Sequence, residues 1–176
     1  MTDFLAADAG IRELYARYTD AVFRKDADAF GELFTEDGEW RISGLVMRGR
    51  TNIANTIRGL FPRYRRIVMN FRDPIIDLAD GTANVRVYVS EQSMLADGTP
   101  YGPIGIYFDR CVEQQGRWRF AWRLFQTHYS GSPDMTGTFF DNPDFGPPPG
   151  MPPLDAEAID HTGNLTRQKA AATQDQ

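Results

Sequence analysis

Four long segments in the middle of the chain alternate apolar and polar residues, and a glycine-containing turn separates each from the next. They cover about residues 67–78, 82–95, 104–114 and 117–128, and the turns read ADG, ADGTP and QQG. Alternation places successive side chains on opposite faces of a strand, and such breaks are typical of hairpins. The pattern therefore predicts a meander of four antiparallel strands.

The first third of the chain predicts helices. Residues 8–25 place apolar side chains at steps of three and four, which gives one buried helical face. Asp26 is the expected N-cap of a short second helix, and Thr51 is the expected N-cap of a third. The Asp-Gly pair at 37–38 is expected to be a turn that leads into a short strand.

Helices gathered on one side of a strongly curved antiparallel sheet make an α+β architecture. We expect residues 1–130 to form one domain, in which a cone-shaped sheet wraps around the N-terminal helices. The open end of such a cone is a natural pocket for a small molecule.

Composition excludes several classes of function. The chain has 176 residues and a formal net charge of −5, so it offers no broad basic surface to nucleic acid. It lacks the pattern of a signal peptide and any apolar stretch near the roughly 20 residues of a membrane span. The lone Cys111 cannot form an internal disulfide, and two isolated histidines do not make a metal site. We expect a cytoplasmic protein without membrane contact or bound metal.

The tail, residues 131–176, differs from the rest of the chain. Seven of the eleven prolines lie in residues 131–153, which excludes a central strand or a helix. The segment is either a strap laid over the domain or a partner, or a disordered end. Its phenylalanines, Phe139, Phe140 and Phe145, favour the strap, and the last dozen residues are expected to be loose.

The blocks IRELYARYTDAVFRKDADAFGELFTEDGEWRISG, RGRTNIANTI, DGTANVRVYV and GRWRFAWR follow one another over roughly residues 5–130. In order and spacing they resemble the SnoaL-like branch of the nuclear transport factor 2-like superfamily. That branch includes polyketide cyclases, scytalone dehydratase, hexachlorocyclohexane dehydrochlorinase, steroid isomerases and the small subunits of ring-hydroxylating dioxygenases. The resemblance implies the cone fold, and it says less about the reaction because one fold hosts many functions.

The resemblance also implies an aspartate–histidine pair, in which the histidine takes a proton and the aspartate orients it. In this sequence the aspartate position falls on Phe23 and the histidine position on Met69. Neither side chain can transfer a proton. Chemistry in this chain would therefore depend on other groups.

Three residues are the candidates for that chemistry. Asp20 lies one helical turn before Phe23, and burial in the cone would raise its pKa and make it an acid-base group; the alternative is a solvent-facing carboxylate paired with an arginine. Arg123 would stabilise an oxyanion, or would only bridge to a carboxylate such as Asp109. Tyr88 would act beside Arg123.

By analogy with the dehydrochlorinase, the second long strand turns Tyr88 and Ser90 into the cone and its valines outward. The aromatic members of the candidate set have core packing as their alternative interpretation. His128 at the end of the last strand has a smaller chance of lining the mouth. The expected substrate-binding residues are Tyr18, Phe23, Trp40, Leu60, Tyr64, Met69, Arg86 and Ser90.

These residues suit a lyase or isomerase that needs no cofactor and acts by elimination, dehydration or retro-aldol cleavage on a small aromatic or alicyclic molecule. The alternative is a non-catalytic ligand-binding protein, or a scaffold like a dioxygenase small subunit. A convex sheet face usually needs a cover, so we expect a homotrimer or homodimer. Either the valine stripe 85, 87, 89 or the tryptophan face of the last strand would form the interface.

Overall fold

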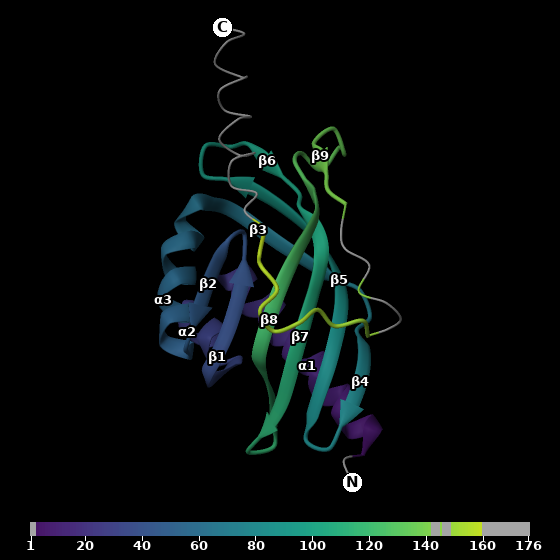
Figure 1. Ribbon diagram of the computed structural model, residues 1–176. Coiled ribbons are helices and arrows are strands. Elements are labelled where there is room, and N and C mark those ends of the chain that lie inside the picture. Colours follow the sequence, from purple (N-terminus) through teal and green to yellow (C-terminus); the bar gives the residue numbers. More distant parts are fainter. Residues whose placement is uncertain (1–2, 142–144, 146–148, 160–176) are drawn as a thin grey trace, which may run out of the picture.

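The computed structural model describes residues 3–141, 145 and 149–159, and shows a curled sheet closed on one side by helices (Figure 1). The helices are α1 (Phe4–Arg24), α2 (Ala27–Gly31), α3 (Arg50–Leu60) and the 3₁₀ turn η1 (Phe61–Arg63). The strands are β1 (Phe34–Ile42), β2 (Leu45–Arg48), β3 (Tyr64–Phe71), β4 (Ile75–Ala79), β5 (Thr82–Leu95), β6 (Pro100–Tyr101), β7 (Ile104–Gln114), β8 (Arg117–Ser130) and β9 (Thr138–Phe139).

The sheet confirms the α+β cone and corrects one feature of it. The strand order is β2-β1-β8-β7-β5-β3, with β4 and β6 on β5 and β9 on β8. All pairs are antiparallel except β1 with β8, which is parallel, so the sheet is mixed. The Asp-Gly pair at 37–38 lies inside β1, where the register against β8 shifts, and is not the expected turn. An irregularity of this kind bends a strand without ending it.

The helix ends follow from local capping. The side chain of Asp26 accepts a hydrogen bond from the Ala29 amide at 2.9 Å, which confirms its role as the N-cap of α2. Thr51 is not the cap of α3, because that helix begins one residue earlier, after Gly49. Gly49 has a φ of 84°, a left-handed conformation that favours glycine over any residue with a side-chain cap.

The first expected long strand is divided in two. β3 ends at Phe71 and β4 begins at Ile75, and both pair with β5. The break precedes and includes Pro74, which has no amide hydrogen to contribute to a ladder. Residues 67–78 read as one alternating segment, so the sequence pattern alone did not reveal the break between β3 and β4.

Strand β5 has the opposite orientation from the one expected. Its valines 85, 87 and 89 are buried in the core, whereas Tyr88 is 43% exposed and Arg86 and Ser90 are half-buried on the outer face. Burying three β-branched side chains is worth more than burying an arginine and a tyrosine without partners. The valine stripe is therefore core and not an interface.

A bulge in β8 redirects its side chains. Arg110 pairs with Trp122 and Cys111 pairs with Phe120, so Ala121 is an extra residue. Both Phe120 and Arg123 consequently face the interior, although strict alternation placed them on opposite faces. The expected continuous tryptophan face does not exist, because Trp118 and Phe120 lie in the cone core while Trp122 points outward.

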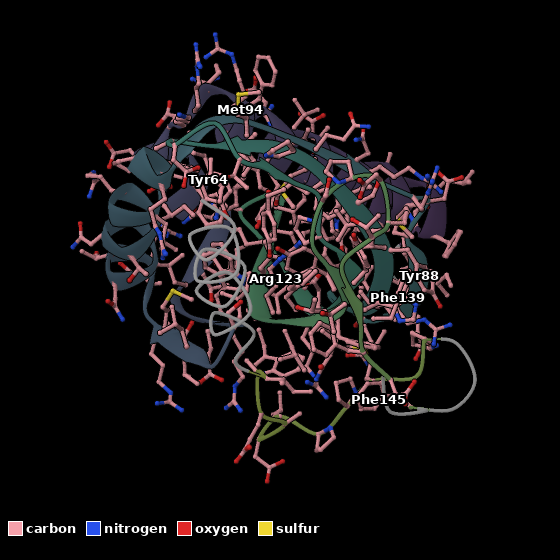
Figure 2. The ribbon with its side chains drawn as sticks, turned by 90° about the horizontal axis from the view of Figure 1, so that it is seen from above. Tyr64, Tyr88, Met94, Arg123, Phe139 and Phe145 are labelled. Carbon is pink, nitrogen blue, oxygen red and sulfur yellow. The ribbon has the colours of Figure 1, made fainter. Side chains whose placement is uncertain are left out.

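The described part of the tail lies across the outer side of β7 and β8 (Figures 1 and 2). The ring of Phe145 is 4.8 Å from that of Phe108. This outer cluster also contains Trp122, Leu124, Met151, Ala156 and Ala158. Phe139 is more exposed and stacks on Tyr129 at 4.8 Å. The last dozen residues and His161 lie outside the described residues.

Gly105 lies where β7 packs closely against β8, so substituting it tests this packing. An added Cβ would lie 2.4 Å from the backbone oxygen of Gln126 and 2.6 Å from the Phe125 ring. We expect Gly105→Ala to lower the free energy of unfolding by about 1–3 kcal/mol, measured by urea denaturation. Gly59→Ala, in an exposed turn of α3 with open space around it, is the control and should stabilise by about 0.5–1 kcal/mol. Equal effects of the two changes would contradict this packing.

Candidate active site at the mouth of the cone

The centre of the cone holds a buried arginine. Arg123 has no exposed surface, and its guanidinium lies 3.6 Å from the ring centre of Tyr107 and 4.4 Å from that of Tyr18 (Figure 2). Its Nη1 atom forms an ion pair with Asp109 Oδ2 at 3.1 Å. The interpretation of Arg123 as the partner of Asp109 is confirmed. Arg123 does not line the cavity described below.

Asp109 and Arg123 stabilise each other's charge in this buried environment. The hydroxyl of Tyr15 donates to Asp109 Oδ2 at 2.5 Å. Burial raises the pKa of Asp109 to about 6, against the opposing effect of Arg123 and Tyr15. Burial alone would lower the pKa of Arg123, but the Asp109 carboxylate raises it above its ordinary value, so the guanidinium stays charged.

Aromatic rings fill the lower cone around this pair. The hydroxyls of Tyr18 and Tyr107 lie 3.2 Å apart, and Tyr18 is almost fully buried. Other rings of this cluster are Tyr15, Phe30, Phe34, Phe71 and Phe120. Tyr18 is therefore a core residue, and the expected wide hollow at this depth is occupied by side chains.

A small cavity remains above these rings, at the open end of the cone. Its volume is about 90 Å³, well below the roughly 300–1,000 Å³ of typical ligand pockets. Of the expected substrate-binding residues, Tyr64 and Met69 line it. The complete lining is Ile42, Ser43, Tyr64, Met69, Val89, Glu91, Tyr101, Pro103, Tyr107, Phe125 and Thr127.

Glu91 is the charged residue of this lining, and sequence reasoning missed it. It follows the inward valines of β5 at the same two-residue step, and burial raises its pKa to about 7. The hydroxyl of Ser93 donates to it, which opposes that shift. In the described part of the chain no arginine, lysine or histidine forms an ion pair with Glu91. Its carboxyl is therefore poised to gain or lose a proton near neutral pH.

Three tyrosines line the cavity together with Glu91. Burial raises the pKa of Tyr64, Tyr101 and Tyr107, and the negative charge of Glu91 adds to each shift. The effect of Glu91 on all three indicates that they lie near it. The Tyr101 hydroxyl is also 3.3 Å from Ser130 Oγ. The cavity thus combines one proton-transfer group with neutral hydrogen-bond donors, an arrangement suited to acid-base chemistry on an oxygen-bearing molecule.

Asp20 does not belong to this site. Its side chain is 62% exposed and paired with Arg24 at 3.0 Å, so the expectation of a buried acid-base group is wrong. It lies in a surface groove of about 310 Å³ between α1 and the β7–β8 turn. Phe23 is 65% exposed and likewise does not line the cavity.

The other expected site residues lie in the core or on the outer face of the sheet and do not line the cavity. Trp40 is buried 5.3 Å from the Phe30 ring, which confirms packing, and Leu60 packs against the core. Arg86 lies over the Tyr88 ring at 5.9 Å. Tyr88 lies on the outer face (Figure 2). Tyr88 and Ser90 therefore do not enter the cone. His128 lines a separate outer groove with Tyr88, away from the mouth.

Glu91 could have been predicted to line the cavity if the inward face of β5 had been assigned correctly. Valines 85, 87 and 89 form an uninterrupted apolar run, and the next two positions on that face are Glu91 and Ser93. Had the valines been assigned to the core, the alternation would have placed the carboxyl inside. The choice of the inward face of β5 thus decided whether Tyr88 and Ser90 or Glu91 was predicted to line the site.

Comparison with known proteins identifies the family. The SnoaL-like domain matches residues 3–123. The chain belongs to the SnoaL-like family. A search of curated proteins finds no match.

Several solved structures share this fold. LinA is 20% identical over 79% of this chain and 96% of its own, with a TM-score of 0.68. LinA-type3 hexachlorocyclohexane dehydrochlorinase from Novosphingobium barchaimii is 17% identical over 79% and 97%, with a TM-score of 0.67. A variant of Rv3472, a protein of unknown function from Mycobacterium tuberculosis, is 26% identical over 68% and 70%, with a TM-score of 0.62. In the described part of this SnoaL-like chain, every helix is too short or too polar to span a membrane.

Removing one partner of the buried ion pair should cost much more than removing both. We expect Arg123→Met alone to lower the free energy of unfolding by about 3–5 kcal/mol, because it leaves Asp109 buried without a countercharge. Arg123→Met combined with Asp109→Leu should cost less than the two single changes added together. Urea denaturation of the four proteins measures this coupling, and simple additivity would show that the two groups do not depend on each other.

The raised pKa of Glu91 predicts a pH dependence of stability. Because the folded state holds this proton more tightly than the unfolded state, the contribution is largest below pH 4.5 and is lost as the pH rises to about 7. Between pH 5 and 8, the free energy of unfolding of the unmodified chain should fall by up to about 3 kcal/mol more than that of Glu91→Gln. Parallel slopes for the two proteins, from urea denaturation at each pH, would mean that Glu91 is not buried as described.

Proposed function

We propose that this SnoaL-like protein is a lyase or isomerase that needs no cofactor and acts on a small aromatic or alicyclic molecule at the cone mouth. The observation that carries the proposal is Glu91, a carboxyl with a pKa of about 7 that lines the cavity at the cone mouth and has no ion-pair partner among the described residues. A group with that pKa is present in both protonation states at neutral pH, as acid-base catalysis requires.

The proposed reaction uses Glu91 as base and then as acid. The carboxylate removes a proton from the carbon beside a carbonyl, and the electrons of the C–H bond form an enolate. Hydroxyl donors of Tyr64 and Tyr101 stabilise the oxygen on which the negative charge develops. Protonated Glu91 then returns the proton, either to a leaving hydroxyl, which departs as water, or to another carbon, which isomerises the substrate.

Arg123 has an indirect role in this proposal. It lies behind Tyr107, whose ring separates it from the cavity, and Asp109 neutralises much of its charge. We therefore treat Arg123 as a positioning residue for Tyr107 and not as the oxyanion partner. Met69, in place of the family's histidine, supplies part of the apolar wall, together with Ile42 and Phe125.

The size of the cavity limits the substrate. A volume of about 90 Å³ is below the roughly 150 Å³ of an engineered cavity that holds benzene. The expected aromatic or alicyclic substrate would therefore insert only the reacting part of its ring, and the rest would lie at the open mouth.

A homotrimer or homodimer in the cytoplasm remains a prediction. With the valines buried, the remaining outer surface for an interface is the groove that contains Tyr88, Ile104, Ile106 and His128. Light scattering measures the assembly state.

The second candidate function is ligand binding without catalysis, or a scaffold role. The observation that favours it is the replacement of both family dyad positions by Phe23 and Met69. In that case the cavity would bind a small molecule and leave it unchanged.

A minimal probe tests catalysis. We expect the chain to dehydrate 3-hydroxycyclohexanone to cyclohexenone, followed by the ultraviolet absorbance of the enone, with a rate that rises with pH through about 7. Glu91→Gln should reduce kcat/KM by about 100-fold or more. Asp20→Asn, which changes an exposed carboxylate outside the cavity, is the matched control and should leave the rate unchanged.

Two results would contradict the proposal. Full activity in Glu91→Gln would remove the acid-base role. Binding of the ketone to the unmodified chain, without elimination and without exchange of its α-protons in D₂O, would favour the ligand-binding alternative.

A further inference from the structure

The outer face of β7 and β8 carries an apolar stripe that the tail covers. Phe108, Trp122 and Leu124 point away from the cone and are buried in a cluster with Phe145 and Met151. Figure 2 shows Phe145 at the outer side of the molecule. Two tail alanines, Ala156 and Ala158, complete the cluster. This outer cluster is separate from the hydrophobic core inside the cone. The cone therefore has a core of its own that does not include the tail.

The groove holds the tail mainly through backbone carbonyls. Arg41 Nη1 donates to the Ala156 oxygen at 2.7 Å, and Arg110 Nη2 donates to the Pro152 oxygen at 3.3 Å. Gln126 Nε2 donates to the Glu157 oxygen at 3.4 Å. Contacts of this kind accept any side chain on the bound segment. They also suit proline, which has a carbonyl but no amide hydrogen.

The groove retains polar atoms that the tail leaves unsatisfied. Among the described residues, Trp122 Nε1, Arg110 Nη1 and Gln126 Oε1 are buried without a hydrogen-bond partner. The Arg110 guanidinium stacks on the Trp122 ring at 4.8 Å, which makes a flat surface with free donors. A buried polar atom without a partner costs free energy, so the described part of the tail is not the best ligand for this groove.

Charge and shape define the better ligand. Residues 143–159 contain six prolines, three acidic residues and no lysine or arginine. The groove presents the Arg110 guanidinium and Arg41 Nη1, although Arg41 Nε is already paired with Glu39 at 2.5 Å. Aromatic surfaces with hydrogen-bond donors bind proline-rich segments in other protein modules. The complementary ligand is therefore an extended, acidic, proline-rich peptide.

We propose that the outer face of β7 and β8 is a binding groove for an acidic, proline-rich segment of another protein chain. The chain's own tail occupies this groove as an internal competitor. Displacement of the tail by the partner would exchange one set of carbonyl acceptors for another that also pairs with the free donors of Trp122 and Arg110. This groove lies on the opposite side of the sheet from the Glu91 cavity, so the inference is independent of the proposed reaction.

A labelled peptide with the sequence of residues 143–159 is the probe, and fluorescence anisotropy measures its affinity for the full chain. Phe145→Ala combined with Met151→Ala loosens the tail without changing the groove. We expect this variant to bind the peptide at least tenfold more tightly than the unmodified chain, because a tethered competitor acts at an effective concentration near the millimolar range. A peptide of the same length in which serine replaces the prolines and the acidic residues should bind more weakly.

Substitutions in the groove distinguish specific binding from nonspecific adsorption of the peptide. Arg110→Ala, added to the loosened variant, should weaken binding by about tenfold through loss of a charged donor. Arg66→Ala, on the exposed edge strand β3, is the matched control and should have no effect. Equal binding by the loosened and unmodified chains, or no effect of Arg110→Ala, would overturn the proposal.

Circular dichroism checks that each variant is folded. If the double variant unfolds, Phe145→Ala alone is measured against the same criteria. Unfolding of both would also overturn the proposal, because the tail would then be an indispensable part of the core and not a displaceable ligand.

Discussion

The ion pair between Arg123 and Asp109 determines how much of this cone is open. A guanidinium without solvent contact needs a carboxylate beside it and rings around it, and the chain provides Asp109 together with Tyr18, Tyr107 and Phe120. Packing these groups fills the lower cone. The remaining free volume, and with it any chemistry, is confined to the mouth.

The bulge at Ala121 makes this arrangement possible. Without the extra residue, alternation along β8 would place Arg123 on the outer face whenever Phe120 faces inward. The same irregularity leaves Trp122 and Leu124 on the outer face, where the tail covers them. One inserted residue therefore serves both the buried ion pair and the surface beneath the tail.

The mouth has a different electrostatic character from the interior below it. Arg123 has a countercharge, whereas no described residue forms an ion pair with Glu91, so burial raises the pKa of the Glu91 carboxyl to about 7 against the single opposing effect of the Ser93 hydrogen bond. This is how a chain without the aspartate–histidine pair that the sequence resemblance implies can still present a proton-transfer group. The carboxyl comes from a different strand, β5, and from a position that the family motif does not mark.

The sequence by itself determined the helices, the strand meander, the cap at Asp26 and the family, because each depends on local periodicity, turn residues or block order. Only the tertiary structure decided which face of β5 is inward, that Asp20 is exposed and that Glu91 lines the cavity. Both faces of β5 carry side chains that a pocket could use, and two-residue alternation does not distinguish them. The choice follows from the burial of the valines in the hydrophobic core, and such long-range packing is not encoded in any single segment.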